Sequence, residues 1–228
     1  MDGTQYDRAY YIDGRASGKS LYVDYRWMPS LTKPMCEAIV LHCGIEKGHS
    51  ILDFGCARGY VVRAFRELGY KAWGIDISKW AIDNCDGTVK EYVQMLDEPH
   101  DAFDWIIAKD VLEHIPSPAL ESAIAKLLMR ARVGVFVVVP LAEMFPSEEM
   151  YSGMDGKPVL RYVVPEYEKD ITHCQRMNLL EWAHKFHDAS LDFSLRLSHV
   201  VPGVKQNYAQ YTRGNGFIVA YRHSTSNP

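Results

Sequence analysis

Two short segments contain the acidic and histidine side chains from which catalysis is expected. Asp110, Glu113 and His114 are spaced at i, i+3 and i+4, so they share one face if the segment turns helically. Downstream, Asp170-Ile-Thr-His173 supplies a second carboxylate and a second imidazole. An imidazole beside a carboxylate can take a proton from a substrate hydroxyl, with either His114 or His173 as the base and the other orienting the substrate. The plain alternative for His114 is a hydrogen bond to backbone near the turn, and for His173 it is a hydrogen bond at the entry of the following helix.

These side chains need an element that places them at a ligand, and the stretch from Ser50 to Ser78 predicts one. The apolar run Ile51–Phe54 leads into a glycine-rich turn, Gly55–Gly59. Apolar residues then recur with a helical period as far as Gly69, where a left-handed residue would end the helix. A second apolar strand ends at Asp76. This order of elements opens a parallel α/β sheet that binds a nucleoside-containing cofactor at the carboxyl ends of its strands.

The spacing within the glycine turn distinguishes between cofactors. The dinucleotide pattern G-x-G-x-x-G does not fit, because its second glycine is Ala57 and its third is the bulky Tyr60. The pattern from Asp53 to Gly59 is D-x-G-x-x-x-G, which resembles the turn of class I S-adenosylmethionine-dependent methyltransferases. In that family the middle position is usually glycine. Because alanine is also small, we expect Ala57 to have little effect on the turn.

The resemblance spans residues 39–141 and implies roles for individual side chains around S-adenosylmethionine (SAM), which leaves the reaction as S-adenosylhomocysteine (SAH). Arg26 would pair with the carboxylate of SAM, and its alternative is a surface ion pair. A carboxylate at Asp76 can accept both hydroxyls of a ribose. The other expected cofactor residues are Asp53, Gly55, Cys56 and Gly59 around the methionyl part, Ile77 on one face of adenine, Met95 or Leu96 on the other, and Lys109 at the end of the fourth strand.

The chemistry-bearing segments carry resemblances of their own. Residues 110–116 are similar to the D-V-L-E-H-I segment of methyltransferases of the ubiquinone-biosynthesis O-methyltransferase group, and residues 170–173 resemble a D-x-T-H turn that faces the cleft in the same group. Plant small-RNA 2′-O-methyltransferases have a similar E-x-x-E-H element that grips a terminal ribose through a metal. A divalent ion held by Asp110, Glu113, His114 and His173 is therefore an alternative. Because the first acid here is Asp and no matching RNA-binding domain is identified, we assign no metal.

Composition limits the classes of partner. The 228-residue chain has a formal net charge of −4 and no long basic run, which argues against affinity for nucleic-acid phosphates. The polar N-terminus is not a secretion signal, and the longest apolar run, Val133–Ala142, is too short to span a bilayer. The five scattered cysteines suggest neither a disulfide framework nor a zinc cluster. We expect a cytoplasmic protein that acts on a small molecule, with no membrane association; the oligomeric state stays open.

We expect one α/β domain with a Rossmann-like, doubly wound, mostly parallel seven-stranded sheet whose last strand is antiparallel. Its parts are an aromatic N-terminal arm or lid (1–30), a SAM-binding core (31–140), a substrate cap (141–176) and a closing helix with strands (177–228). Further helices are expected at Thr32–Cys43, with Pro34 in its first turn, after Ser78 as cap, from Ser117, with Pro118 at the first helical position, and at Asn178–His187, where Asn178 and Glu181 form a capping box. Further strands are expected at Glu91–Leu96, Trp105–Ala108, Val133–Val139, Leu191–Leu197 and Phe217–Tyr221, with a short strand-like piece at Val159–Val163. Within the arm, Gly14–Ser20 looks like a phosphate-binding loop. It is one residue short and follows no strand, so we expect a flexible loop.

The function predicted from these patterns is SAM-dependent transfer of a methyl group to oxygen of a small polar acceptor, such as a saccharide, a nucleotide-linked sugar or a related metabolite. The signature of amino-methylating DNA enzymes is missing, since Ala108–Val111 stands in its place. Three alternatives remain: a metal-using RNA-terminal or nucleoside 2′-O-methyltransferase, a non-catalytic SAM-binding subunit, and a dehydrogenase. The presence of Asp76 and the glycines argues against the second, and binding of NAD in place of SAM would identify the third.

Overall fold

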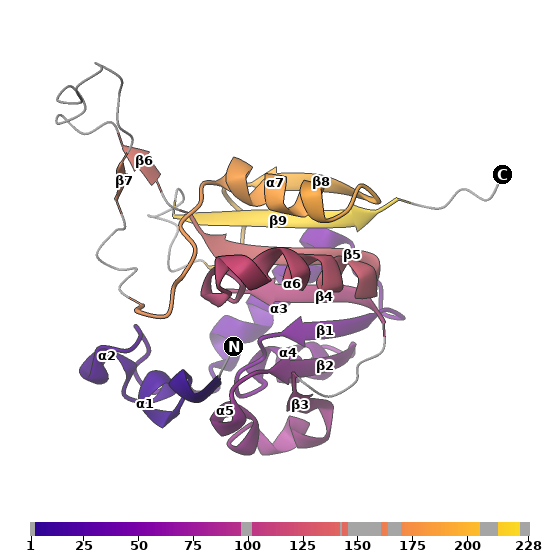
Figure 1. Cartoon of the computed structure of the whole chain (residues 1–228). Coiled ribbons are helices and arrows are strands. Elements are labelled where there is room, and N and C mark those ends of the chain that lie inside the picture. The colour runs from indigo at the N-terminus through magenta and orange to yellow at the C-terminus, as the bar shows by residue number, and fades with distance from the viewer. Residues whose placement is uncertain are drawn as a thin grey trace, which may run out of the picture.

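The computed structural model describes residues 3–96, 102–141, 143–145, 161–163, 170–205 and 214–223. Its centre is a seven-stranded sheet in the order β3-β2-β1-β4-β5-β9-β8 (Figure 1). The strands are β1 (Ser50–Phe54), β2 (Lys71–Asp76), β3 (Val93–Met95), β4 (Phe103–Lys109), β5 (Ala131–Pro140), β8 (Phe193–Ser198) and β9 (Asn215–Arg222). The first five are parallel, and β9 pairs antiparallel with β5 and β8. The expected sheet, including its antiparallel last strand, is confirmed.

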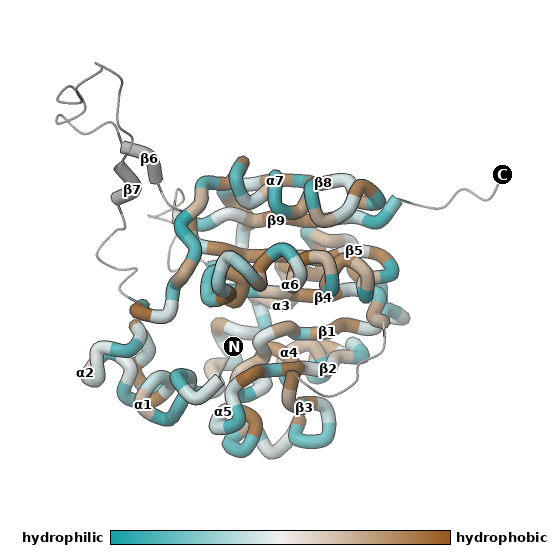
Figure 2. The backbone as a smooth tube through the Cα atoms, in the orientation of Figure 1, coloured by the Kyte–Doolittle hydropathy of each residue, from teal (hydrophilic) through white to brown (hydrophobic). Residues whose placement is uncertain are grey.

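Helices cover both faces of this sheet. They are α3 (Pro29–Cys43), α4 (Tyr60–Glu67), α5 (Lys79–Asp83), α6 (Ser117–Arg130) and α7 (Leu179–Ala189). One hydrophobic cluster joins α6 and α7 to the sheet, and a second joins α3 and α4 to its opposite face. Neighbouring residues of β5 divide between the two, with Val135 in the first cluster and Phe136 in the second. Because β5 is buried on both faces, its sequence is continuously apolar rather than alternating; Figure 2 shows apolar residues concentrated along the central strands.

Local capping interactions explain several element boundaries. The Ser78 hydroxyl accepts a hydrogen bond from Ala81 N and caps α5, and Asn178 with Glu181 forms a capping box at α7, as expected. Gly69 has the expected left-handed conformation, with φ +83°. Pro118 is the second residue of α6 rather than its first. No helix among the described residues is long and apolar enough to cross a bilayer.

Some boundaries differ from the sequence-based expectations. Helix α3 begins at Pro29 rather than Thr32, so Pro34 lies inside it and not in its first turn. The third strand is shorter than expected, because residues Gly87–Tyr92 form the 3-10 helix η2, which the Asp86 side chain caps at Thr88 N. Strand β8 begins at Phe193, two residues later than expected.

The N-terminal arm is folded into short helices, and the prediction of a flexible loop at Gly14–Ser20 is wrong. It contains η1 (Gly3–Gln5), α1 (Arg8–Tyr11) and α2 (Gly14–Ser17), and it lies beyond the carboxyl ends of the parallel strands (Figure 1). The stretch that looks like a phosphate-binding loop is therefore α2 and the residues that end it. Its Lys19 pairs with Asp7 at 2.7 Å, and Asp7 also caps α1.

The segment expected to cap the substrate lies mostly outside the described residues. Within it, β6 (Glu143–Phe145) and β7 (Arg161–Val163) pair as a separate antiparallel sheet. The strand-like piece expected near Val163 is thus present as β7. The cap assignment itself stays a prediction.

Candidate active site

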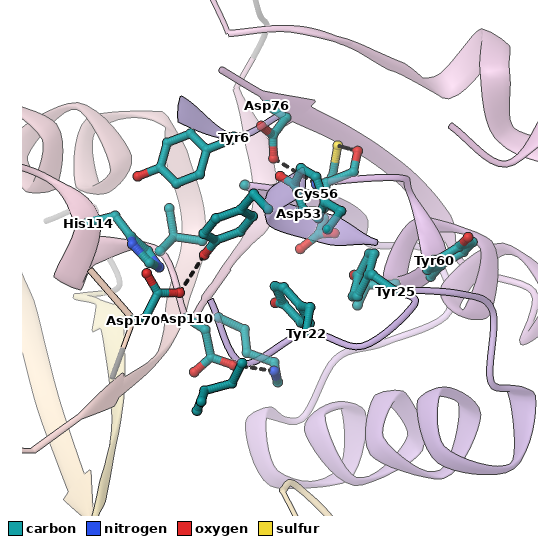
Figure 3. A pocket seen from close by; sticks show the side chains of 18 of the residues that line it. Tyr6, Tyr22, Tyr25, Asp53, Cys56, Tyr60, Asp76, Asp110, His114 and Asp170 are labelled. Carbon is teal, nitrogen blue, oxygen red and sulfur yellow. Dashed lines mark hydrogen bonds and ion pairs between the residues drawn. The ribbon is translucent and has the colours of Figure 1, made fainter. Parts of the chain in front are cut away.

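A cavity of about 590 Å³ lies between the carboxyl edge of the sheet and the N-terminal arm. Most of the predicted site residues line it: Arg26, Asp53, Gly55, Cys56, Asp76, Ile77, Leu96, Lys109, Asp110, Glu113, His114 and His173. Gly59 and Met95 are not among the residues that line the described cavity. Figure 3 shows His114 and Asp170 on one side, apart from Asp53, Cys56 and Asp76. The cavity therefore joins the glycine turn to the histidine segment.

The glycine turn takes its shape from left-handed backbone conformations. Gly55, Ala57 and Gly59 have φ values of +81°, +49° and +79°. A Cβ atom on Gly55 would lie 2.3 Å from Cγ2 of Val111, so only glycine lets the two segments approach this closely. Ala57 adopts a conformation that costs an alanine roughly 1–2 kcal/mol. Alanine in place of glycine at position 57 therefore costs more conformational free energy than the small size of its side chain suggests.

Asp76 is held rigidly at the end of β2. Its Oδ2 accepts a hydrogen bond from Ala57 N and its Oδ1 accepts one from Ser78 N, both at 2.7 Å. Burial raises the pKa of this carboxyl, and the two backbone donors oppose that rise. The backbone N–H of Leu96 donates to the carbonyl oxygen of Asp76 at 2.9 Å, which brings the ribose candidate and one adenine candidate together. Each carboxylate oxygen keeps a further lone pair for a ligand hydroxyl.

A group of partly buried charges also lines the cavity. Lys109 Nζ lies 2.5 Å from Asp110 Oδ2, and Lys205 Nζ lies 2.5 Å from Asp110 Oδ1. Burial favours the neutral form of Asp110, but the two ammonium groups outweigh it and hold the pKa of this carboxyl well below its usual range. Asp53 differs, because its burial and the charge of Asp76 outweigh Lys109 and raise its pKa to about 7. Asp53 is therefore partly protonated near neutral pH.

Glu113 and His114 lie on the 3-10 turn η3 (Leu112–His114), in place of the longer helical turn that their spacing suggests. Glu113 is 1% exposed, and its Oε2 has no hydrogen-bond partner among the described residues. Burial, together with the charge of Asp110, raises the pKa of Glu113 well above its usual range. Its backbone carbonyl accepts hydrogen bonds from Cys174 N (2.7 Å) and Gln175 N (3.1 Å), so η3 is fastened to the 170–175 turn.

The two candidate bases lie side by side. The ring centroids of His114 and His173 are 4.7 Å apart, and the Tyr6 ring contacts His114 edge-on at 5.8 Å. Burial, and next the neighbouring His173, lowers the pKa of His114 to about 4. Burial also lowers the pKa of His173. Both imidazoles are thus neutral near pH 7 and have a lone pair that can accept a proton. One ligand atom each of Glu113, His114 and His173 lies within 4.8 Å of the others, which is close enough for a shared metal ion.

Arg26 is placed at the rim and not at the glycine turn. It is exposed and pairs with Asp24 at 2.7 Å, which is the surface ion pair that the sequence left as its alternative.

The arm contributes functional candidates that sequence reasoning named only as a group. Five tyrosines of the arm line the cavity: Tyr6, Tyr10, Tyr11, Tyr22 and Tyr25. The Tyr10 hydroxyl donates to Asp170 Oδ2 at 2.8 Å, and the Ser78 hydroxyl donates to the Tyr6 carbonyl at 2.5 Å. Thr172 belongs to the D-x-T-H turn but was given no role from the sequence; its hydroxyl oxygen lies 2.7 Å from Nδ1 of His114. No local pattern signals these contacts, because the partners are far apart in the sequence.

Comparison with known proteins gives a family for most of the chain. A family model described as a methyltransferase domain matches residues 28–193. The chain is 30% identical over 101 residues to a ubiquinone biosynthesis O-methyltransferase of Aeromonas salmonicida (strain A449), covering 40% of this chain and 42% of that protein. It is 27% identical over 150 residues to the protein of the same name from Pseudoalteromonas translucida (strain TAC 125), covering 59% and 61%. The chain thus spans about half the length of these curated relatives.

A solved structure gives the same fold. The 1,6-didemethyltoxoflavin-N1-methyltransferase of Burkholderia thailandensis, solved with bound 1,6-didemethyltoxoflavin and SAH, superposes with a TM-score of 0.56 at 15% identity. The match covers 94% of this chain and 84% of that chain. At this identity the likeness concerns the fold and not the acceptor.

Proposed function

Because the chain belongs to the methyltransferase-domain family and is a class I SAM-dependent methyltransferase, we propose that it methylates an oxygen atom of a small polar acceptor. The acceptor class we propose is a saccharide, a nucleotide-linked sugar or a related hydroxyl-bearing metabolite. The observation that carries the proposal is one cavity lined both by the glycine turn at Gly55 and by the neutral imidazole of His114. The naming of both curated relatives as O-methyltransferases supports oxygen as the methylated atom.

The cavity suits SAM in size and in donor chemistry. Its volume of about 590 Å³ lies within the range typical of sites for ligands of this size. The missing side chain of Gly55 leaves backbone within reach of the ligand, while Asp76 would accept the ribose hydroxyls. Ile77 and Leu96 would contact adenine, and the Asp53 carboxylate would face the cationic methionyl end. When bound, SAM supplies a methyl group already activated by a positively charged sulfur.

Because the methyl group is already activated, the protein contributes mainly position and a proton acceptor. His114 would take the proton of the acceptor hydroxyl, which a sugar hydroxyl needs because it is a poor nucleophile. His173, at 4.7 Å between ring centroids, would orient the acceptor. The tyrosines of the arm offer flat faces to the carbon side of a sugar ring and close the cavity against water. We propose the arm as a lid on this basis.

The proposal is tested by separating cofactor binding from turnover. Titration calorimetry with SAH, and in parallel with NAD, should show binding of SAH alone. A screen of sugar and nucleotide-sugar acceptors that detects SAH release should then identify a substrate.

His114→Gln should lower kcat by about 10²–10⁴-fold, the usual contribution of a general base, while the Kd for SAH stays within about twofold. The matched control, His184→Gln, changes an exposed histidine of α7 and should behave as wild type.

The outcomes distinguish the alternatives. Unchanged turnover in His114→Gln would exclude this residue as the base. SAH binding without turnover on any acceptor would favour a non-catalytic SAM-binding subunit. Failure of the folded protein to bind SAH would contradict the proposal as a whole.

A second candidate function is favoured by the group of Glu113, His114 and His173. The Oε2 of Glu113, which has no hydrogen-bond partner within the described part of the chain, and the 4.8 Å spacing suit a divalent ion. Such an ion would bind the hydroxyls of a terminal ribose in RNA or a nucleoside. Assays after chelation and after return of Mg²⁺, Mn²⁺ or Zn²⁺ decide between the two candidates. Strict dependence on one ion, with turnover of an RNA 3′-end or a nucleoside, would favour the second. Full activity in EDTA supports the first.

A further inference from the structure

A chain of hydrogen bonds leads from His114 to Asp170. The Nδ1 atom of His114 lies 2.7 Å from Oγ1 of Thr172, and the same Oγ1 lies 2.5 Å from Oδ1 of Asp170. Asp170 Oδ1 also accepts a hydrogen bond from Thr172 N at 2.9 Å, while its Oδ2 accepts one from the Tyr10 hydroxyl at 2.8 Å. Figure 3 shows Asp170 beside His114 with the bond from the arm. Asp170 thus receives three donors.

The direction of each bond follows from the number of hydrogens available. An ionised aspartate only accepts, and a threonine hydroxyl has a single hydrogen to donate. The Thr172 hydrogen is therefore committed to Asp170, and Thr172 Oγ1 can only accept from His114. For that bond the hydrogen must reside on Nδ1 of His114. A neutral imidazole with its hydrogen on Nδ1 has its free lone pair on Nε2.

We propose that Asp170 and Thr172 are positioning residues that hold His114 as the Nδ1–H tautomer, so that Nε2 is the atom that accepts the substrate proton. The assignment of the substrate proton rests on the proposed function, whereas the tautomer itself does not. Thr172 acts as a spacer between carboxylate and imidazole, because its hydroxyl both donates and accepts.

The surrounding structure keeps this chain of bonds in place. Thr172 is 6% exposed, so water competes little for its hydroxyl. The bond from its backbone N–H to Asp170 closes a local turn that fixes where the hydroxyl lies. The backbone bonds from Cys174 and Gln175 to Glu113 hold the two segments together next to the imidazole, although His114 and Thr172 are 58 residues apart.

The proposed step balances in atoms and charge. The acceptor oxygen forms its new bond to the methyl carbon while the carbon–sulfur bond breaks and its electron pair moves to sulfur. The hydroxyl proton passes to Nε2 of His114, so the positive charge leaves sulfur and appears on the imidazolium. The Asp170 carboxylate, two hydrogen bonds away, stabilises that charge. The products are the methyl ether and SAH, and His114 then releases the proton to solvent.

Two substitutions at Thr172 form a matched pair. Thr172→Val keeps the shape but loses the hydroxyl, whereas Thr172→Ser keeps the hydroxyl. With ¹⁵N-labelled histidine, EDTA present and pH near 7.5, the wild-type His114 signals should show a protonated Nδ1 and an unprotonated Nε2. Thr172→Ser should keep this pattern, and Thr172→Val should populate the Nε2–H form. His114→Gln assigns the signals by their disappearance.

Turnover should fall in the variants in which the tautomer of His114 changes. Thr172→Val should lower kcat by about 10–100-fold, by analogy with the partners that orient metal-ligating histidines, with the Kd for SAH within about twofold. Thr172→Ser should stay within about threefold of wild type. Asp170→Asn offers an independent check, because its amide can donate to Thr172 and turn the hydroxyl toward His114, which should favour Nε2–H and lower kcat similarly.

The outcomes are separable from those of the proposed function. A wild-type His114 with its hydrogen on Nε2, or no change of tautomer in Thr172→Val, would overturn the inference whatever the activity. If no acceptor is turned over, the proposed function fails while the tautomer spectra still decide the inference. If Thr172→Val does not fold, the wild-type spectrum and Asp170→Asn decide it.

Discussion

The two ends of the cavity are held in place by different kinds of interaction. At the cofactor end, the glycine turn and Asp76 depend on backbone conformation and on backbone N–H donors within a segment of 29 residues from Ser50 to Ser78. At the acceptor end, the contacts are between side chains of distant segments, as in Tyr10 with Asp170, which are 160 residues apart. One end is therefore specified locally and the other by tertiary packing.

This difference determines how freely residues can vary at each end of the cavity. A backbone cradle restricts changes of residue type, because a residue other than glycine at a left-handed position carries strain, as Ala57 does. Side-chain contacts such as Thr172 to His114 can be altered one atom at a time. We infer that substitutions at the cofactor end act on binding and stability together, and that those at the acceptor end act mainly on turnover.

The largest effect is expected from Gly55→Ala. The new Cβ would lie 2.3 Å from Val111 Cγ2, on a backbone with φ +81°. We expect the free energy of unfolding to fall by about 2–4 kcal/mol, from left-handed strain and overpacking, and the Kd for SAH to rise at least about tenfold, or 1.4 kcal/mol. Urea unfolding and calorimetry measure the two quantities.

Gly48→Ala is the control, because no described atom lies within 4 Å of its added Cβ; its stability should change by less than about 0.5 kcal/mol. If Gly55→Ala binds SAH with the wild-type Kd, the inferred difference between the two ends of the cavity is contradicted.

An intermediate effect is expected from pH acting on Asp53. Burial, with the charge of Asp76, raises its pKa to about 7, so a fall in pH through 7 protonates it and removes the negative charge that would face the cationic end of SAM. Affinity for SAM should fall with decreasing pH, with a limiting slope of about tenfold per pH unit. Asp53→Asn should bind more weakly and lack this dependence between pH 6 and 8. Calorimetry across that range measures it, and an equal slope in both proteins would assign the dependence to another group.

The same carboxyl affects the stability of the ligand-free protein in a predictable direction. Because the pKa of Asp53 is raised from 3.8 to about 7, its contribution to stability is fully present below pH 3.8 and is lost as the pH rises through 7. Relative to wild type, Asp53→Asn should therefore gain stability between pH 5 and pH 8.

The smallest effect is expected from Tyr10→Phe. The change removes one of the three donors to Asp170 and leaves the ring packing of the arm intact. We expect a loss of about 1 kcal/mol in stability, the usual net value of a hydrogen bond, and a fall in kcat of only a few-fold with the Kd for SAH unchanged. Tyr70→Phe, outside the lining of the cavity, should leave turnover unchanged. A larger effect of Tyr10→Phe on SAH binding than on turnover would place the arm with the cofactor end.

How much of the structure could be predicted from the sequence follows the same division between local and tertiary interactions. The sheet could be predicted because apolar periodicity, Gly69, Ser78 and the Asn178 capping box are local signals, and they occur where the elements begin and end. The short helices of the arm could not, since four-residue helices carry too little periodicity; α1 depends on the cap by Asp7. The shortened third strand has a local cause as well, the capping of η2 by Asp86.

For the candidate site, the sequence predicted which segments meet but not how they meet. His114 and His173 were expected at one cleft, and their rings are in contact. The hydroxyl of Thr172 between His114 and Asp170 depends on a turn geometry that residue types alone do not specify. Gly59 belongs to the same pattern as Gly55, yet it packs beside Val89 instead of lining the cavity, because a motif gives spacing and not direction.

The antiparallel insertion of β9 has a consequence for the order of assembly during synthesis. Strand β5, with its run of apolar residues from Val133 to Val139, pairs along one edge with β9, which begins only at Asn215. Until the ribosome has released that later segment, the nascent chain exposes one unpaired edge of this apolar strand, which is a template for intermolecular pairing. Chains truncated before Asn215 should aggregate on release, and the full-length nascent chain should need chaperone protection in the interval when β5 has emerged and β9 has not.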